Sequence, residues 1–293
     1  MSRDHARLQW AAQLSPVLRW VGSKRWAAER LAALIALRLK PQTGVYYEPF
    51  LGAGAVALAL PFQTPMILSD LCPALAGLWI WIKRDPGALH RCLQQNWRND
   101  EVTYYAIRDV FNEDHYSATD PLPSARMLWL NAAGFNGLYR ENKSGQYNTP
   151  FGHRKTISLP TLEELTAISA HLQRTTIEVA DFADALQDVQ PGDVIYCDPP
   201  YDVDSEDPSV TTPTFVAYTK SGFAAAEQAD LARVLTAQRT AGAFVITTNA
   251  DTPLVRELYP SRYWLLEMIE EPRRVAADPK KRVSASCLII TSR

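Results

Sequence analysis

The sequence predicts an α/β protein built on a mostly parallel sheet that helices cover on both faces. Short apolar segments typical of strands alternate with segments in which alanine, leucine and isoleucine recur at helical spacing, and this alternation is typical of parallel sheets. Two of the apolar segments end in aspartate, at the edge where open α/β sheets bind ligands. We expect strands near residues 45–50, 66–70, 176–180, 193–198, 243–248, 263–269 and 286–291, and helices near 23–39, 55–60, 73–83, 225–240 and 253–258.

The amino-terminal elements follow from residue spacing. Apolar residues repeat on one face of residues 23–39, and Pro41 stands just beyond the end of this expected helix. The next strand, 45–50, is followed by a glycine turn and by an alanine-rich helix near 55–60. Residues 84–170 break the alternation and are expected to form a helical insertion rich in aromatic side chains.

The glycine turn is typical of a nucleoside site. Gly52 and Gly54 let a ligand approach the backbone, and the start of the following helix offers unpaired N–H donors. Asp70 ends the next strand, 16 residues beyond Gly54, where an acidic residue typically binds ribose hydroxyls. The phosphate-binding Lys-Ser/Thr and the third glycine of a dinucleotide motif are missing, so a nucleoside without pyrophosphate, such as S-adenosylmethionine, fits better than NAD.

The chemically most specific feature is Asp198-Pro199-Pro200-Tyr201, which closes the apolar run 194–197. The Asp198 carboxylate and the Pro199 carbonyl can accept both protons of an exocyclic amine, while Tyr201 stacks on its ring. The nitrogen lone pair then leaves conjugation and can attack a methyl donor. Four residues alone fit an ordinary Asp-Pro turn equally well, so this interpretation depends on the motifs around them.

Composition excludes several classes of protein. A length of 293 residues and a hydrophobic content of 47% are ordinary for a globular chain. The four cysteines and five histidines show no paired spacing, so neither a disulfide framework nor a metal site is expected. Cys197 is expected to be a small buried side chain rather than a cytosine-C5 nucleophile. No signal peptide is apparent, and the longest apolar run, 51–60, is too short for a bilayer; we expect a cytoplasmic protein without membrane contact.

Charge is unevenly distributed. The net charge of −2 is unusual for a protein that binds nucleic acid, but ten acidic residues and no basic one lie in 178–207. Between residues 126 and 155 five basic residues face one acidic residue, and between 273 and 293 six face one. Two basic patches suffice to hold a polyanion. Solvated surface loops are the alternative, which suits the carboxyl-terminal patch better than the middle one.

Further short motifs accompany these features in a fixed order. The segments are Leu18–Lys24, Glu48–Gly54, Asn131–Gly152, Asp181-Phe182 and, after the proline turn, Phe215–Tyr218, Phe223 and Glu227-Gln228. As an ordered set from about Leu18 to Ile290, they resemble the Dam-type DNA adenine-N6 methyltransferases. The resemblance implies a seven-stranded, Rossmann-like methyltransferase sheet with one antiparallel strand.

The resemblance also implies roles for individual residues. Catalysis would fall to Asp198, Pro199, Pro200 and Tyr201. Contacts to S-adenosylmethionine would come from Trp20, Lys24, Glu48, Phe50, Gly52, Gly54, Asp70, Asp181, Phe182 and Asp198. DNA contacts would come from Arg19, Phe135, Asn136, Leu138, Arg140 and Lys143. The chain would divide into residues 1–83 and 171–293, which form the catalytic domain, and an inserted DNA target-recognition region, 84–170.

The expected function is site-specific transfer of a methyl group from S-adenosylmethionine to N6 of a flipped-out adenine in double-stranded DNA. A cytosine-N4 methyltransferase uses the same chemistry but usually has serine at the position of Asp198. A protein or RNA methylase has no need of Phe135-Asn136. The alternative of a DNA-binding relative that has lost catalysis is opposed by the intact Trp20, Lys24, Asp70 and Asp198. A restriction endonuclease partner stays open, as does the choice between monomer and dimer.

Overall fold

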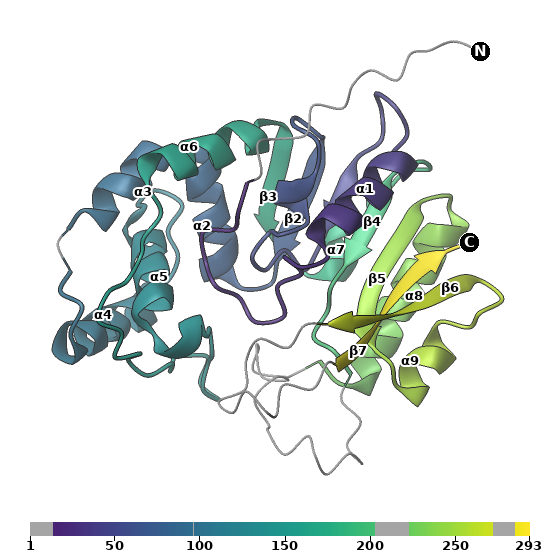
Figure 1. Cartoon of the computed structure of the whole chain (residues 1–293). Helices are drawn as coiled ribbons and strands as arrows, with labels where there is room; N and C mark the ends of the chain where they lie inside the picture. The colour runs from purple at the N-terminus through teal and green to yellow at the C-terminus, as the bar shows by residue number, and fades with distance from the viewer. Residues whose placement is uncertain (1–13, 96, 203–222, 272–284) are drawn as a thin grey trace.

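The computed structural model describes residues 14–95, 97–202, 223–271 and 285–293. Within them, one sheet has its strands in the order β3-β2-β1-β4-β5-β7-β6 (Figure 1). The strands are β1 (Tyr46–Glu48), β2 (Met66–Asp70), β3 (Thr175–Val179), β4 (Val194–Cys197), β5 (Phe244–Ala250), β6 (Trp264–Glu271) and β7 (Ala285–Ser292).

The strand pairing confirms the expected methyltransferase-like α/β sheet. Strands β3, β2, β1, β4 and β5 pair in parallel, whereas β7 is antiparallel to both β5 and β6. From the centre of the sheet, β1, β2 and β3 follow one another toward one side, and β4 and β5 toward the other. The order of the strands therefore reverses between β1 and β4, which lie side by side. Open α/β sheets bind ligands at such a switch point, beyond the carboxyl ends of the strands. Both the glycine turn after β1 and the proline turn after β4 therefore lie at the ligand-binding edge.

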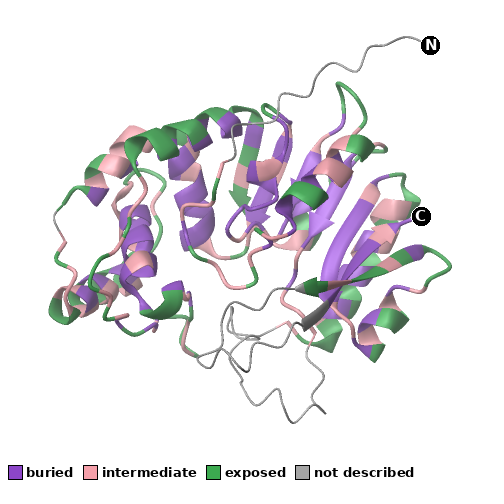
Figure 2. Cartoon of the chain, viewed as in Figure 1, coloured by how far each residue is buried: buried purple, intermediate pink, exposed green. Residues whose placement is uncertain are grey.

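Alternate residues of each strand enter two different cores, so both faces of the sheet are covered. In β4, Val194 and Tyr196 join one core with residues of α1 and α2, while Ile195 and Cys197 join the other with residues of α8. Figure 2 shows these central strands as continuously buried. The covering elements are α1 (Ala28–Arg38), η1 (Ala57–Ala59), α2 (Pro73–Arg84), α7 (Phe182–Ala185), α8 (Ala225–Thr240) and α9 (Pro253–Leu258).

The expected helical insertion lies beyond the β3 edge of the sheet (Figure 1). Side chains cap its helices: Asp85, Asp100 and Thr161 each accept a hydrogen bond from a backbone N–H in the first turn. Helix α2 contacts both the sheet and the insertion, and the aromatic residues of the insertion share one core with α1 and β1. The elements are α3 (Pro86–Leu93), α4 (Glu101–Glu113), α5 (Leu122–Ala133), η2 (Phe135–Gly137), α6 (Leu162–His171) and η3 (Leu172–Arg174).

Two expected helices are shorter than the sequence pattern indicated. Helix α1 begins at Ala28 rather than near Ser23, because residues 23–27 form hydrogen-bonded turns that direct Lys24 toward Asp198. The alanine-rich segment after the glycine turn forms only the 3-10 turn η1, and Leu60 leaves helical geometry just before Pro61. The short helix α7 was not expected, and the helices of the insertion had no individual expected ranges; the seven strands and helices α2, α8 and α9 match the expected ranges within a few residues at each end.

Some expectations concern parts of the chain outside the described residues. These are the Phe215–Tyr218 motif, the end of the acidic stretch 178–207 from residue 203 onward, and the basic cluster of the carboxyl-terminal segment, Arg273, Arg274, Lys280, Lys281 and Arg282. Among the described residues, no helix is both long and apolar enough to cross a membrane.

Candidate active site

A buried ion pair joins the amino-terminal motif to the proline turn. The ammonium nitrogen of Lys24 lies 2.9 Å from both carboxylate oxygens of Asp198 and 2.7 Å from the carbonyl oxygen of Gly22. It also lies 4.6 Å from the ring centre of Tyr201. Lys24 is only 4% exposed, and a charge at such depth requires a partner. The buried ion pair thus holds together two residues that are 174 positions apart in the sequence.

Two buried amides hold the backbone on either side of Tyr201. The Gln228 side chain in α8 donates to the Pro200 carbonyl at 2.9 Å and accepts from the Asn249 amide at 2.9 Å. Asn249 in turn accepts from the Asp202 backbone N–H at 3.0 Å. Both amides are fully buried, and buried polar groups of this kind are stable only when they are hydrogen-bonded. The backbone of the turn is therefore fixed immediately before and after the tyrosine.

The side chains of the turn are also held. The Tyr201 hydroxyl lies 2.9 Å from the Cys287 sulfur in β7, and the Thr248 hydroxyl in β5 donates to Asp198 at 2.6 Å. The carboxylate and the aromatic ring are thus each tied to a different strand. This arrangement keeps an acceptor and a stacking surface in a constant relation to each other.

The glycine turn adopts the backbone conformation that its sequence requires. Gly52 and Gly54 have φ of +50° and +64°, in the left-handed region. A Cβ atom added to Gly52 would lie 3.0 Å from the Trp20 ring, so the absent side chain lets the amino-terminal motif pack on the turn. Asp70, at the end of β2, accepts from the backbone N–H groups of Gly52 and Cys72, each at 3.0 Å. Trp20, Gly52 and Asp70 are therefore brought together.

Aromatic rings gather beside this turn. The Phe50 ring is stacked on that of Phe182 at 5.8 Å between centroids, and the Phe223 ring meets Phe50 edge-on at 5.7 Å. Asp181 caps α7 by accepting from the Ala183 N–H at 2.9 Å. Each of these three rings is only partly buried. They could take a flat apolar group next to a carboxylate.

Burial changes the protonation of three groups at this edge of the sheet. It raises the pKa of Glu48 to about 8, an effect that the nearby Asp198 and Asp70 carboxylates reinforce and a hydrogen bond from Tyr46 opposes. Burial raises the pKa of Asp70 to about 6, against two backbone hydrogen bonds that lower it. It raises the pKa of the Cys197 thiol well above its usual value. Because a nucleophilic cysteine needs an accessible thiolate, the expectation of a buried, unreactive Cys197 fits the structure.

Most of the predicted DNA residues are exposed. Phe135 is 49% exposed and so does not pack in the core, and Asn136 beside it has φ of +54°. Arg140 is exposed and donates from Nε to the Asn148 side chain at 2.7 Å. The remaining candidates differ in exposure: Arg19 and Lys143 are exposed, and Leu138 is partly buried.

The amino-terminal motif is attached to this region by one buried amide. The Asn131 side chain accepts from the Arg19 N–H at 2.8 Å and donates to the carbonyl oxygens of Arg19 and Gly137 at 2.8 and 2.9 Å. The Trp20 ring stacks on Tyr139 at 5.2 Å between centroids. The cofactor motif and the predicted recognition residues are thus one connected structure.

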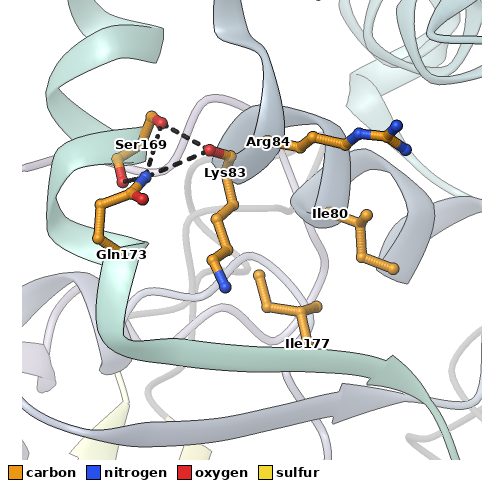
Figure 3. A pocket seen from close by; sticks show the side chains of 6 residues that line it. All are labelled: Ile80, Lys83, Arg84, Ser169, Gln173 and Ile177. Carbon is orange, nitrogen blue, oxygen red and sulfur yellow. Dashed lines mark hydrogen bonds between the residues drawn. The ribbon is translucent and has the colours of Figure 1, made fainter.

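A separate cavity of about 370 Å³ lies between α2, α6 and β3. It is lined by Ile80, Lys83, Arg84, Ser169, Gln173 and Ile177 (Figure 3). The Lys83 ammonium donates to the carbonyl of Thr175, the first residue of β3, and Ser169 donates to the Lys83 carbonyl. These polar groups connect α2, α6 and β3. They are used in packing, and the cavity is distant from the carboxyl ends of the strands.

Sequence reasoning did not identify several residues that hold the site. Thr248, Asn249 and Cys287 were not candidates, and Asn131 and Gln228 were named only as parts of motifs. One signal was present: β5 ends in Thr247-Thr248-Asn249 after an apolar run, and polar residues in a central strand need partners. The neighbouring strand was not identifiable without the sheet order.

Comparison with known proteins agrees with this geometry. Residues 20–275 match the family described as D12 class N6 adenine-specific DNA methyltransferase. The chain is 34% identical to the retron Ec67 DNA adenine methylase of Escherichia coli, over 95% of this chain and 92% of that protein. It is 33% identical to the DNA adenine methylase of Haemophilus influenzae, over 94% and 92%, and 30% identical to the type II methyltransferase M1.LlaDCHI of Lactococcus lactis, over 95% of each chain. The chain belongs to the D12 class of N6 adenine-specific DNA methyltransferases.

Proposed function

We propose that the chain uses S-adenosylmethionine to methylate N6 of an adenine that has been flipped out of double-stranded DNA at a specific site. The observation that carries this proposal is the joining of three motifs at the switch point of the sheet. Lys24 pairs with Asp198, Trp20 packs on the glycine turn, and the same amino-terminal motif contacts the recognition region through Asn131.

The residues around the glycine turn fit this cofactor. Asp70 presents a carboxylate for ribose hydroxyls, the partly buried rings of Phe50 and Phe182 suit an adenine, and Asp181 directly precedes Phe182. Trp20, Lys24 and Glu48 would face the methionine end, with Gly52 and Gly54 allowing close approach. When bound, S-adenosylmethionine supplies an electrophilic methyl group on a sulfonium ion.

The proline turn would hold the nucleophile. Asp198 and the Pro199 carbonyl accept the two N6 protons, which raises the electron density on the nitrogen, and Asp198 stabilises the positive charge that develops there. Stacking on Tyr201 contributes about 1–3 kcal/mol, which offsets part of the few kcal/mol needed to flip the base. Since the turn is fixed by Gln228, Asn249 and β5, most of the rate acceleration would come from aligning the adenine amine with the methyl group.

The insertion, residues 84–170, would read the DNA. The exposed Phe135 suits insertion into the base stack beside the vacated position, with Asn136 next to the unpaired thymine. The exposed guanidinium of Arg140 suits a guanine O6/N7 pair, and Arg19 approaches from the amino-terminal motif. Leu138 and Lys143 would complete the contact, Lys143 at a phosphate.

One relative is named a type II methyltransferase, which favours testing for a restriction endonuclease partner.

The paired Lys24 and Asp198 argue against an inactive DNA-binding relative, because a buried ion pair without function is costly to keep.

Labelled methyl transfer tests the proposal directly. Duplex DNA is incubated with the purified chain and methyl-labelled S-adenosylmethionine, and the nucleosides are separated after digestion. Label should appear in N6-methyladenosine, and methylation-aware sequencing should place it at one short site. Label in N4-methylcytosine, or none in any nucleoside, would contradict the proposal.

A further inference from the structure

We propose that Thr248 is a positioning residue that sets the rotation of the Asp198 carboxylate, and that it does so through a single hydrogen bond. The inference rests on the proposed role of Asp198 as an acceptor of the adenine amine. It assigns a function to a residue of β5 that is not itself among the predicted catalytic, cofactor or DNA residues. Thr248 is 1% exposed, so solvent cannot replace its contact.

The register of the sheet places Thr248 beside the turn. Cys197, the last residue of β4, pairs with Thr247, and the next residues on the two strands are Asp198 and Thr248. The Thr248 oxygen lies 2.6 Å from Asp198 Oδ1 and 3.5 Å from the Tyr196 hydroxyl. Because the ionised carboxylate has no proton, Thr248 must donate its only one to Asp198. The Tyr196 hydroxyl is then the donor in the longer contact, which directs the Thr248 proton toward the carboxylate.

The Lys24 ammonium cannot set this rotation alone. It lies 2.9 Å from Oδ1 and 2.9 Å from Oδ2 and donates its hydrogen bond to Oδ2, so it fixes the distance to the carboxylate while Oδ1 is held by another donor. The last torsion of an aspartate is broad, and an ammonium is a compact charge on a flexible stem. Thr248 contacts Oδ1 alone and comes from a central strand. It therefore distinguishes the two oxygens and selects one orientation of the carboxylate.

That orientation leaves one oxygen suited to the substrate. Oδ1 accepts a hydrogen bond from Thr248, whereas Oδ2 accepts one from Lys24. A carboxylate oxygen can accept two hydrogen bonds, so Oδ2 keeps capacity for an N6 proton. Loss of the Thr248 hydroxyl would let the carboxylate rotate and misalign the nitrogen. Misalignment of this kind lowers the rate of chemistry on the order of a hundredfold while binding is preserved.

The adjacent residue provides a matched control. Thr247 is also fully buried and lies on the opposite face of β5, and its hydroxyl has no hydrogen-bond partner among the described residues. Thr248→Val and Thr247→Val remove the same hydroxyl from neighbouring positions and keep a branched side chain suited to a strand. Thr248→Ser restores the hydroxyl without the methyl group.

The experiment measures single-turnover methyl transfer together with duplex and S-adenosylmethionine affinity. Thr248→Val should slow methyl transfer at least about tenfold with both affinities within about threefold of wild type. Thr248→Ser should recover most of the rate, and Thr247→Val should match wild type. An unchanged Thr248→Val rate, equal losses in the two valine variants, or failure of Thr248→Ser to recover activity would overturn the inference.

Asp198→Ala, assayed in parallel, separates this inference from the proposal on which it rests. If Asp198→Ala retains the wild-type rate, the proposed role of Asp198 is wrong. If Asp198→Ala is inactive while Thr248→Val is fully active, only the role of Thr248 is wrong.

Discussion

The proline turn and the recognition region are stabilised in different ways. At the turn, the functional side chains themselves are held: Asp198 by Lys24 and Thr248, and Tyr201 by contact with Cys287. In the recognition region it is mainly the backbone that is held, with Asn131 bonded to main-chain atoms of Arg19 and Gly137, while Phe135 stays exposed.

The difference matches two physical tasks. Chemistry requires a donor, an acceptor and a ring in one fixed arrangement, which buried hydrogen bonds provide. Reading a duplex requires side chains that exchange water for base edges and phosphates, so they must start exposed. The predictions below test this separation.

The largest effect is expected on the pH dependence of the free energy of unfolding, and its source is the buried Glu48. Its pKa is raised by burial to about 8, against about 4.3 in an unfolded chain. Between these values the folded chain binds a proton that the unfolded chain lacks, so the free energy of unfolding falls as pH rises. The Glu48→Gln variant does not lose stability in this way. The difference between its free energy of unfolding and that of wild type should therefore increase in favour of the variant, by on the order of a few kcal/mol, between pH 5 and 8.

Urea unfolding at several pH values measures this effect. The exposed Glu257→Gln in α9 serves as the control, and its curve should run parallel to wild type. If Glu48→Gln also runs parallel to wild type, Glu48 does not hold a proton in the folded state.

The next effect concerns stacking on Tyr201. Tyr201→Ala removes the ring and should lower the single-turnover rate about 5- to 150-fold, the equivalent of about 1–3 kcal/mol. Tyr201→Phe keeps the ring and loses only the contact with Cys287, so its rate should lie much closer to wild type. Equal losses in the two variants would show that the hydroxyl contact, rather than the ring face, is what matters.

Asp70→Ala should weaken S-adenosylmethionine binding at least about tenfold, because a hydrogen bond to a charged group contributes about 1.5–3 kcal/mol. Asp70 also accepts from Gly52 and Cys72, so Asp70→Asn, which keeps one acceptor oxygen, should lose less. Calorimetry measures both affinities, and a melting curve confirms folding. Unchanged affinity in Asp70→Ala would show that the carboxylate serves only the turn.

The narrowest effects, each confined to one base pair or one phosphate contact, are expected in the recognition region. Arg140→Ala should cost about 1–3 kcal/mol at one base pair and relax selectivity there alone. Lys143→Ala should weaken all sequences alike and reduce the salt slope by about one unit. Methylation rates across a randomised duplex at two salt concentrations measure both. If Arg140→Ala lowers every sequence equally, Arg140 holds the backbone and Arg19 becomes the first candidate for base contact.

Much of this architecture was predictable from local pattern. The strands, the glycine turn and the proline turn all lie at the expected edge because short apolar runs and their terminal residues are local signals. The length of α1 was overestimated because Lys24 is drawn to Asp198, a partner 174 residues away. Thr248 and Asn249 were missed for the same reason: their importance depends on which strand lies next to β5. Asn131 likewise acquires its role only from the distant Arg19.

Single-turnover methyl transfer by Asp198→Ala, measured beside duplex binding, tests the separation of chemistry from reading most directly. Transfer to adenine should fall by at least about a hundredfold because the amine loses its charged acceptor. Specific duplex affinity should stay within a few-fold of wild type, because the recognition residues are supported by Asn131 and not by the turn. Retained methyl transfer, or loss of specific binding together with activity in a folded variant, would contradict the account.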